Sequence, residues 1–182
     1  MNAQSNQGTR RTFTVYELVL LPILGVLMYI SKLLMEFLPN IHLLGMFIVV
    51  YTLVFRYKAL IPIYIYVFLL GIYGGFSPWW VPNLYIWTIL WLVTMLLPRN
   101  MSRQTCAFVY TLVCAMHGFA FGLLYVPGQA LLTGMNFEAS VAWVISGLPF
   151  DAIHGLGNLL TGLLILPLTD LIRRLLKTVQ KY

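Results

Sequence analysis

The sequence predicts an all-α integral membrane protein with six transmembrane helices, and its composition and its length lead to this prediction. Of the 182 residues, 60% are hydrophobic and only 9% are charged, whereas a soluble domain carries roughly 25% charged residues. The mean hydropathy is +0.87. A transmembrane helix needs about 20 apolar residues, so the length allows roughly six spans and no sizeable soluble domain. We therefore expect residues 1–182 to form a single membrane domain.

Apolar runs follow one another along the whole chain, separated by short polar or Pro/Gly-rich loops. The longest loops are GGFSPWWVPN (74–83), after the third run, and VPGQALLTGMNFEAS (126–140), after the fifth. The predicted spans cover residues 16–37, 41–55, 59–74, 84–97, 104–125 and 142–177.

The basic residues orient the predicted helices. In the six-span arrangement ten of the eleven fall on one side, and the remaining one, Lys32, lies inside the first span. By the positive-inside rule that side is cytoplasmic, which makes residues 1–13 and 173–182 cytoplasmic tails. Because the net charge of +6 is spread over short loops, it does not indicate a nucleic-acid partner. The ten are Arg10, Arg11, Arg56, Lys58, Arg99, Arg103, Arg173, Arg174, Lys177 and Lys181.

The sixth span carries a polar stripe in an otherwise apolar helix. Asp151, His154 and Asn158 are spaced i, i+3 and i+7, so they share one helix face. Polar and ionisable groups inside a membrane segment are costly and point to a cavity or pathway. We interpret the stripe as a ligand site and expect substitution of Asp151 or Asn158 to weaken binding. A structural pair of Asp151 and His154, and an interhelical hydrogen bond from Asn158, are the alternatives.

Aromatic and polar residues gather toward the predicted outer side. Tryptophans of an interfacial belt would produce part of this pattern, but their position beside a long outer loop and the polar stripe favours an aromatic-lined pocket. On the first span, Lys32 and Glu36 are spaced i, i+4, so they can neutralise one another or line the same cavity. The candidate pocket residues on this side are Trp79, Trp80, Asn83, Trp87 and Trp143.

Two sequence features bear on packing and on catalysis. Gly118 and Gly122 form a GxxxG pattern, which allows close approach of helix backbones in lipid. None of the motifs HExxH, paired CxxC, GxxxxGK[ST] or GxSxG occurs. We therefore expect no enzyme, no cofactor and no bound metal, and an intramembrane enzyme using Asp151 and His154 is the lesser interpretation. Without a nucleotide site, another subunit must supply energy for any uphill transport.

The length, the six spans and four sequence strings resemble the substrate-binding S components of energy-coupling factor (ECF-type ABC) vitamin transporters. The strings are LPNI (38–41), IYIYVFLLGIYGGF (63–76), LYIWTIL (84–90) and GLPFDAIHGLGN (147–158). The resemblance implies a bacterial plasma-membrane protein with a high-affinity site near its outer face. It also implies a transmembrane coupling subunit and two cytoplasmic ATPases as partners. Family members dock through small residues on the first helix, where this chain has only Gly25.

The polar stripe and the tryptophans favour a flat, hydrogen-bonding ligand. A pyridoxine- or hydroxymethylpyrimidine-like heteroaromatic ring is our first choice, followed by cobalamin and then by pantothenate, whose carboxylate would have Lys32 as its partner. A self-sufficient secondary transporter or a channel is the alternative class. Against it stand the absence of a convincing internal repeat and the apolar inner half of the sixth span, LLTGLLILPL.

Overall fold

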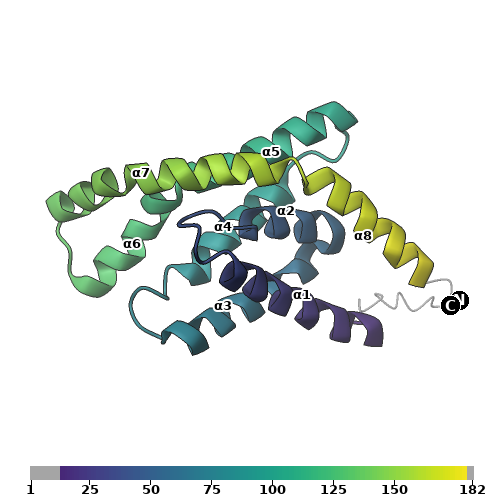
Figure 1. The fold of residues 1–182 in the computed structure, drawn as a ribbon, viewed down its shortest axis with the longest axis horizontal. Coiled ribbons are helices and arrows are strands. Elements are labelled where there is room, and N and C mark those ends of the chain that lie inside the picture. Colours follow the sequence, from purple (N-terminus) through teal and green to yellow (C-terminus); the bar gives the residue numbers. More distant parts are fainter. Residues whose placement is uncertain (1–12, 180–182) are drawn as a thin grey trace, which may run out of the picture.

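The computed structural model describes residues 13–179, and every regular element in this range is a helix. Together the helices form an elongated bundle (Figure 1). Three basic residues used to orient the chain, Arg10, Arg11 and Lys181, lie outside the described residues. The helices are α1 (Val15–Leu34), α2 (Leu44–Phe55), α3 (Leu60–Gly74), α4 (Asn83–Leu96), α5 (Arg103–Phe119), α6 (Phe121–Thr133), α7 (Phe137–Gly162) and α8 (Ile165–Val179), with a 3-10 turn, Arg56–Ala59, between α2 and α3.

Helix α1 starts at a capping box and runs in the same direction as α3. Thr14 Oγ1 accepts the N–H of Glu17 at 3.3 Å, and Glu17 Oε2 accepts the N–H of Thr14 at 3.0 Å. The same carboxylate pairs with Lys58 at 2.5 Å, just before α3. Further along, Gly25 meets Pro62 O, from which a Cβ on the glycine would lie only 2.8 Å away. Residues later in α1 thus contact residues later in the segment of α3, so the two helices lie side by side and parallel.

Helices α2 and α4 also run in the same direction. At their starts the ring of His42 packs against Trp87, with 6.1 Å between centroids. At their ends Arg56 Nη2 donates to the carbonyl of Met95 at 3.1 Å. The indole of Trp91 donates in turn to the carbonyl of Arg56, at 3.1 Å.

The chain reverses direction between α2 and α3. Leu44, at the start of α2, and Gly74, at the end of α3, line the same cavity, so the intervening turn brings the chain back along itself. Within this turn Arg56 has φ 56°, a positive value that residues other than Gly adopt rarely. The continuous helical stretch of residues 44–74 is therefore two antiparallel arms.

Helices α5 and α7 form an antiparallel pair in close contact. A Cβ on Gly118 would lie 2.9 Å from the Cα and N of Gly155, and a Cβ on Gly162 would lie 3.0 Å from Thr111 Cγ2. Side chains larger than hydrogen would force the backbones apart. The prediction that Gly118 allows close helix approach is confirmed.

The predicted long loop at 126–140 is wrong, because most of it is helical. Helix α5 ends at Phe119, and the chain bends by 42° into α6, which continues to Thr133. A turn closed by Gly134, in the left-handed conformation at φ 71°, then leads into α7. Helices α6 and α7 thus form a hairpin, which projects at the left of Figure 1.

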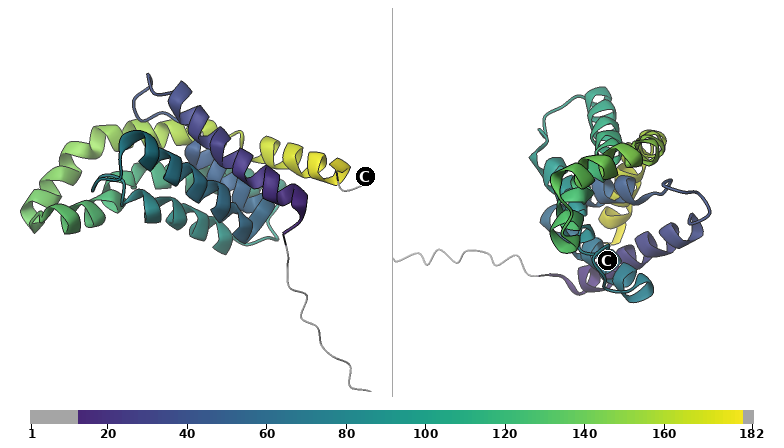
Figure 2. Two further views of the ribbon diagram at one scale, coloured as in Figure 1. Left: turned by 90° about the horizontal axis from the view of Figure 1, so that it is seen from below. Right: turned by 90° about the vertical axis from the view of Figure 1, so that its left-hand side faces the viewer.

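The predicted single helix at 142–177 is also wrong. Helix α7 ends at Gly162 and α8 begins at Ile165, so residues 173–179, predicted as part of a tail, belong to a helix. Helix α8 extends away from the end of α7 (Figure 2). It is amphipathic, because the spacing of Leu168, Leu171, Ile172 and Leu175 puts them on one side and that of Asp170, Arg173, Arg174 and Lys177 on the other.

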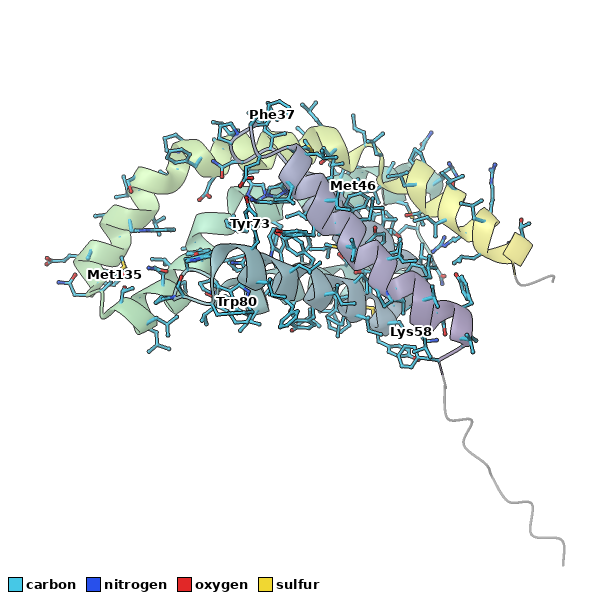
Figure 3. All side chains as sticks on the ribbon, turned by 60° about the horizontal axis from the view of Figure 1, so that its bottom comes forward. Phe37, Met46, Lys58, Tyr73, Trp80 and Met135 are labelled. Atoms are coloured by element: carbon cyan, nitrogen blue, oxygen red, sulfur yellow. The ribbon has the colours of Figure 1, made fainter. Side chains whose placement is uncertain are left out.

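Basic residues gather at one end of the bundle, which we call the basic end. Lys58 lies there and Met135 lies at the opposite end, with Tyr73 and Trp80 between them (Figure 3). Arg103 pairs with Asp170 at 2.8 Å, which joins α5 to α8 at this end. The described basic residues in this group are Arg56, Lys58, Arg99 and Arg103, together with Arg173, Arg174 and Lys177 of α8.

By length and composition alone, three helical stretches could cross a membrane, although the second consists of the two antiparallel arms α2 and α3. They are Val15–Leu34, Leu44–Gly74 and Phe137–Gly162, and the bent pair Arg103–Phe119 and Phe121–Thr133 makes a fourth if it counts as one span. Helix α4 is apolar but shorter. The all-helical prediction is confirmed for residues 13–179, and the apolar helices are compatible with a membrane protein.

Candidate functional site

A cavity of about 500 Å³ lies between the basic end and the tip of the α6–α7 hairpin, beside Tyr73 (Figure 3). Its volume lies within the roughly 300–1,000 Å³ typical of small-molecule sites. Residues from α1 to α4, α6 and α7 line it, so it forms only when segments distant in sequence pack together. We call it the aromatic cavity after the rings in its wall: His42, Tyr66, Tyr73, Trp79, Trp87, Phe121, Tyr125 and His154.

All three histidines of the chain lie around this cavity. The rings of His42 and His154 are 4.6 Å apart, and His154 also packs against Phe121 at 4.8 Å. Behind the wall, His117 packs against Trp87 at 5.6 Å and bonds through Nε2 to a backbone carbonyl. Nε2 of His154 and Nδ1 of His42 are buried and have no hydrogen-bond partner among the described residues. Buried imidazole nitrogens without a partner are unusual, and they make this part of the wall polar.

Trp87 forms a fixed part of the cavity wall. Its side chain is only 2% exposed, and its indole N–H donates to Asn83 Oδ1 at 3.1 Å. Asn83 Nδ2 donates in turn to the carbonyl of Trp79 at 3.3 Å. This chain of hydrogen bonds joins the start of α4 to the turn before it, and it presents two indole rings to the same space.

An ion pair lies at the edge of the aromatic cavity. Lys32 Nζ is 2.8 Å from Glu36 Oε1, and the two side chains are 26% and 53% exposed. Both residues line the cavity. Since the charges neutralise one another and reach solvent, they make the opening polar without adding net charge.

A second cavity of about 410 Å³ adjoins the first and shares Asn40, Phe121 and Tyr125 with it. We call it the side cavity. The ring of Trp143 stacks on Tyr125 in its wall, with centroids 5.6 Å apart and planes 9° apart. The hydroxyl of Tyr125 donates to the carbonyl of Trp79. Tyr125 therefore connects both cavities to the α6–α7 hairpin.

Asp151 lines the side cavity and caps a neighbouring helix. Its carboxylate accepts the N–H of Gly122, in the first turn of α6, through Oδ1 at 3.0 Å and Oδ2 at 3.1 Å. No side chain of α6 itself caps this helix. A carboxylate at a helix N-terminus is favoured by unpaired N–H groups and by the helix dipole. Asp151 thus fixes the bend between α5 and α6.

The structure brings most of the predicted site residues together. Asp151 and His154 line adjoining cavities, and no hydrogen bond between them is present in the described part of the chain. Residues 13–179 also contain no group of His, Cys, Asp and Glu side chains able to hold a metal ion. The predicted residues in the aromatic cavity are Lys32, Glu36, Trp79, Asn83, Trp87 and His154, and those in the side cavity are Trp143 and Asp151.

Three predicted functional residues lie elsewhere. Asn158 is 0% exposed and lines neither cavity, because its Nδ2 donates to the carbonyl of Cys114 at 3.1 Å between α7 and α5. Trp80 turns away from its neighbour Trp79 and donates to the carbonyl of Val67 at 2.7 Å. Gly25, predicted to dock a partner, is buried against α3. These residues have packing roles in this chain.

Several residues in the wall of the aromatic cavity were not predicted from the sequence, among them Tyr66, Tyr73, Phe121 and Tyr125. In a chain with 15% aromatic residues, an aromatic inside an apolar run carries no local signal of its direction. Asn40 has a weak signal, since it lies in a turn with φ 60°, a conformation that Asn tolerates better than most residues.

Comparison of the chain with protein-family models, with curated proteins and with solved structures finds no match.

Proposed function

We propose that this chain is a multi-pass protein of the bacterial cell membrane that captures a water-soluble vitamin or vitamin precursor, as the S component of an ECF-type importer. The single observation that carries the proposal is the aromatic cavity of about 500 Å³, which lies away from the basic end. A cavity with many rings and few polar groups is typical of a site for a small organic molecule.

In this proposal the bundle crosses the bilayer six times. The spans are α1, α2, α3, α4, the bent pair α5–α6, and α7, while α8 lies along the cytoplasmic surface. The alternating directions of these helices support the arrangement, as does the position of Arg56, Lys58, Arg99 and Arg103 at one end. The positive-inside rule makes that end cytoplasmic, so the aromatic cavity opens outward.

The geometry favours a small heteroaromatic ligand of the pyridoxine or hydroxymethylpyrimidine type. Such a ring stacks on the half-buried Trp79 and lies beside the imidazoles of His42 and His154. Cobalamin would leave most of its volume outside a cavity of this size. Pantothenate would require Lys32 to exchange Glu36 for the ligand's carboxylate.

Import also needs an energy source, which the proposal assigns to other subunits. A transmembrane coupling subunit and two cytoplasmic ATPases would bind this chain after it has captured the vitamin. Since Gly25 is buried, the surface of α1 available to the coupling subunit is its exposed apolar face, which includes Leu18, Ile23 and Leu27.

The proposal is tested by titrating the purified chain with a panel of water-soluble vitamins and following tryptophan fluorescence. Two variants show which tryptophan reports binding. Trp79→Phe removes an indole from the cavity wall, whereas Trp91→Phe removes the indole that donates to Arg56 O at the basic end. We expect one vitamin to bind saturably, with a signal that falls in Trp79→Phe and persists in Trp91→Phe.

Two results would contradict the proposal. One is the absence of binding across the whole panel by protein that circular dichroism shows to be folded. The other is uptake of a vitamin by the chain alone in proteoliposomes, which would favour a self-sufficient transporter.

A further inference from the structure

A third cavity, of about 390 Å³, lies at the basic end, and vitamin capture gives it no role. Arg56, Arg99 and Arg173 line it together. They come from the turn after α2, the loop after α4, and α8, so the fold gathers three guanidinium groups from separate segments. We call this space the arginine cavity.

The arginine cavity contains positive charge without a matching carboxylate. None of its lining residues within the described range 13–179 is an Asp or a Glu. The nearby Asp170 is already paired, at 2.8 Å, with Arg103. Like charges brought together repel one another, and a bound anion would relieve this repulsion.

The arginines retain hydrogen-bond donors after their protein contacts are made. Arg56 Nη2 donates to the carbonyl of Met95 at 3.1 Å, and Arg173 Nη2 donates to the carbonyl of Leu53 at 3.0 Å. Each guanidinium has five N–H groups, so most remain available. Nε of Arg56 is buried without a partner in the described part of the chain. The carbonyl contacts hold two side chains in place beside the cavity.

A neutral donor completes the polar wall. Thr169 lines the cavity, its side chain is only 1% exposed, and its Oγ1 has no hydrogen-bond partner among residues 13–179. Threonines in helices usually satisfy the hydroxyl by bonding to a carbonyl one turn earlier, as Thr94 does to Leu90 O at 2.8 Å. Thr169 therefore offers a buried hydroxyl beside the guanidinium groups.

The remaining wall is apolar and includes Leu53, Leu97 and Leu166. On α8 the exposed Leu171 and Leu175 accompany Arg174 and Lys177, a combination typical of a helix that lies in a membrane interface. The arginine cavity thus opens where lipid headgroups would meet the protein.

From these contacts we infer that the arginine cavity binds a phosphate group, supplied by the headgroup of an anionic phospholipid. Guanidinium groups match phosphate oxygens with paired N–H donors, and a hydroxyl adds a further donor. The leucines in the wall accept the first part of an acyl chain, which favours a lipid over free inorganic phosphate. The inference goes beyond the proposed function, because it needs only that the basic end lies at a membrane surface.

The test uses the full chain, purified in a detergent without phosphate. Binding of short-chain phosphatidylglycerol, short-chain phosphatidylcholine and inorganic phosphate is measured by thermal shift and by native mass spectrometry. Arg99→Gln removes an exposed side chain of the cavity wall, so it should leave folding intact. Arg174→Gln is the matched control, since it removes one charge from the same end but does not line the cavity.

We expect phosphatidylglycerol to bind more tightly than phosphatidylcholine, and Arg99→Gln to weaken this binding about tenfold while Arg174→Gln changes it less than twofold. If inorganic phosphate binds with the same dependence on Arg99, the phosphate site is supported, but its ligand is a soluble phosphate and not a lipid headgroup. Equal phosphatidylglycerol affinity in all three proteins would overturn the inference. So would equal losses in both variants, which would indicate diffuse attraction to a basic surface. Arg99→Gln is also titrated with the vitamin. Because Arg99 does not line the aromatic cavity, vitamin binding by this variant tests the proposed function independently of phospholipid binding.

Discussion

At the scale of single residues, His154 and Asn158 belong to the same polar stripe of α7 but have different roles. His154 faces the aromatic cavity, whereas Asn158 bonds to Cys114 O between α7 and α5. We expect His154→Ala to weaken vitamin binding about tenfold, roughly 1.4 kcal/mol, and to leave the fold intact. Asn158→Ala should leave affinity unchanged and lower the free energy of unfolding by about 1–3 kcal/mol, because the carbonyl of Cys114 loses its buried partner.

The two measurements are the fluorescence titration and unfolding in a denaturing detergent, made on both variants. Vitamin affinity lost in Asn158→Ala and kept in His154→Ala would reverse the assignment and restore Asn158 to the site.

Trp87 supports a second prediction at this scale. Trp87→Phe keeps an aromatic ring in the wall but removes the N–H that Asn83 Oδ1 accepts. The buried oxygen would be left unpaired, so the free energy of unfolding should fall by about 1–3 kcal/mol. Thermal unfolding in detergent measures this loss. The double variant Trp87→Phe with Asn83→Leu also removes the unpaired oxygen, so it should regain part of the lost stability. If it does not, the loss of stability in Trp87→Phe comes from the smaller ring alone.

At the scale of helices, the contact between α5 and α7 depends on glycine. A Cβ on Gly118 would meet the backbone of Gly155 at 2.9 Å, and backbone atoms cannot turn aside as a flexible side chain does. We expect Gly118→Ala to lower the free energy of unfolding by about 1–3 kcal/mol.

Gly147→Ala is the control for this prediction, because Gly147 lies on α7 and no atom is within 4 Å of the position that the new methyl group would take. Alanine favours helix by about 1 kcal/mol over glycine, so this variant should be neutral or more stable. The stabilities are compared by measuring the unfolding temperatures of both variants in the same detergent. Equal stability of the two would mean that the helices adjust to a methyl group at this crossing.

The helix ends show how far sequence reasoning extends. The first four predicted spans lie close to α1–α4, because turn residues and charges mark where each apolar run stops. The sequence prediction misses the break between α7 and α8 although Pro167 indicates it, since a proline ring clashes with the carbonyl four residues earlier, here that of Leu163. Conversely, Pro127 and Gly128 suggest a loop but lie within α6.

Of the candidate site, too, only some residues can be predicted from the sequence. The costly polar groups Asp151 and His154 can be found from the sequence because burial of such groups needs a reason. Trp79 and Trp80 are adjacent in a turn, and the direction of Trp80 depends on a tertiary contact with the carbonyl of Val67, which cannot be derived from spacing.

At the scale of the whole molecule, the proposed topology predicts which positions face each side of the membrane. Ala139→Cys, near the α6–α7 turn, should react with an impermeant maleimide added to intact cells. Asn100→Cys, in the loop after α4, should react only in inverted vesicles. Both side chains are exposed, and Cys106→Ala with Cys114→Ala removes the native thiols. Labelling of both positions from the same side would contradict the arrangement of six spans.

The unequal helix lengths affect how such a bundle sits in lipid. At 1.5 Å per residue the 20 residues of α1 extend about 30 Å, enough for the hydrocarbon core, whereas the 12 residues of α2 extend only about 18 Å. Helix α2 starts at the floor of the aromatic cavity, so the cavity fills the depth that this short helix leaves free. A bound molecule would then rest below the plane of the headgroups, and its affinity would vary with bilayer thickness.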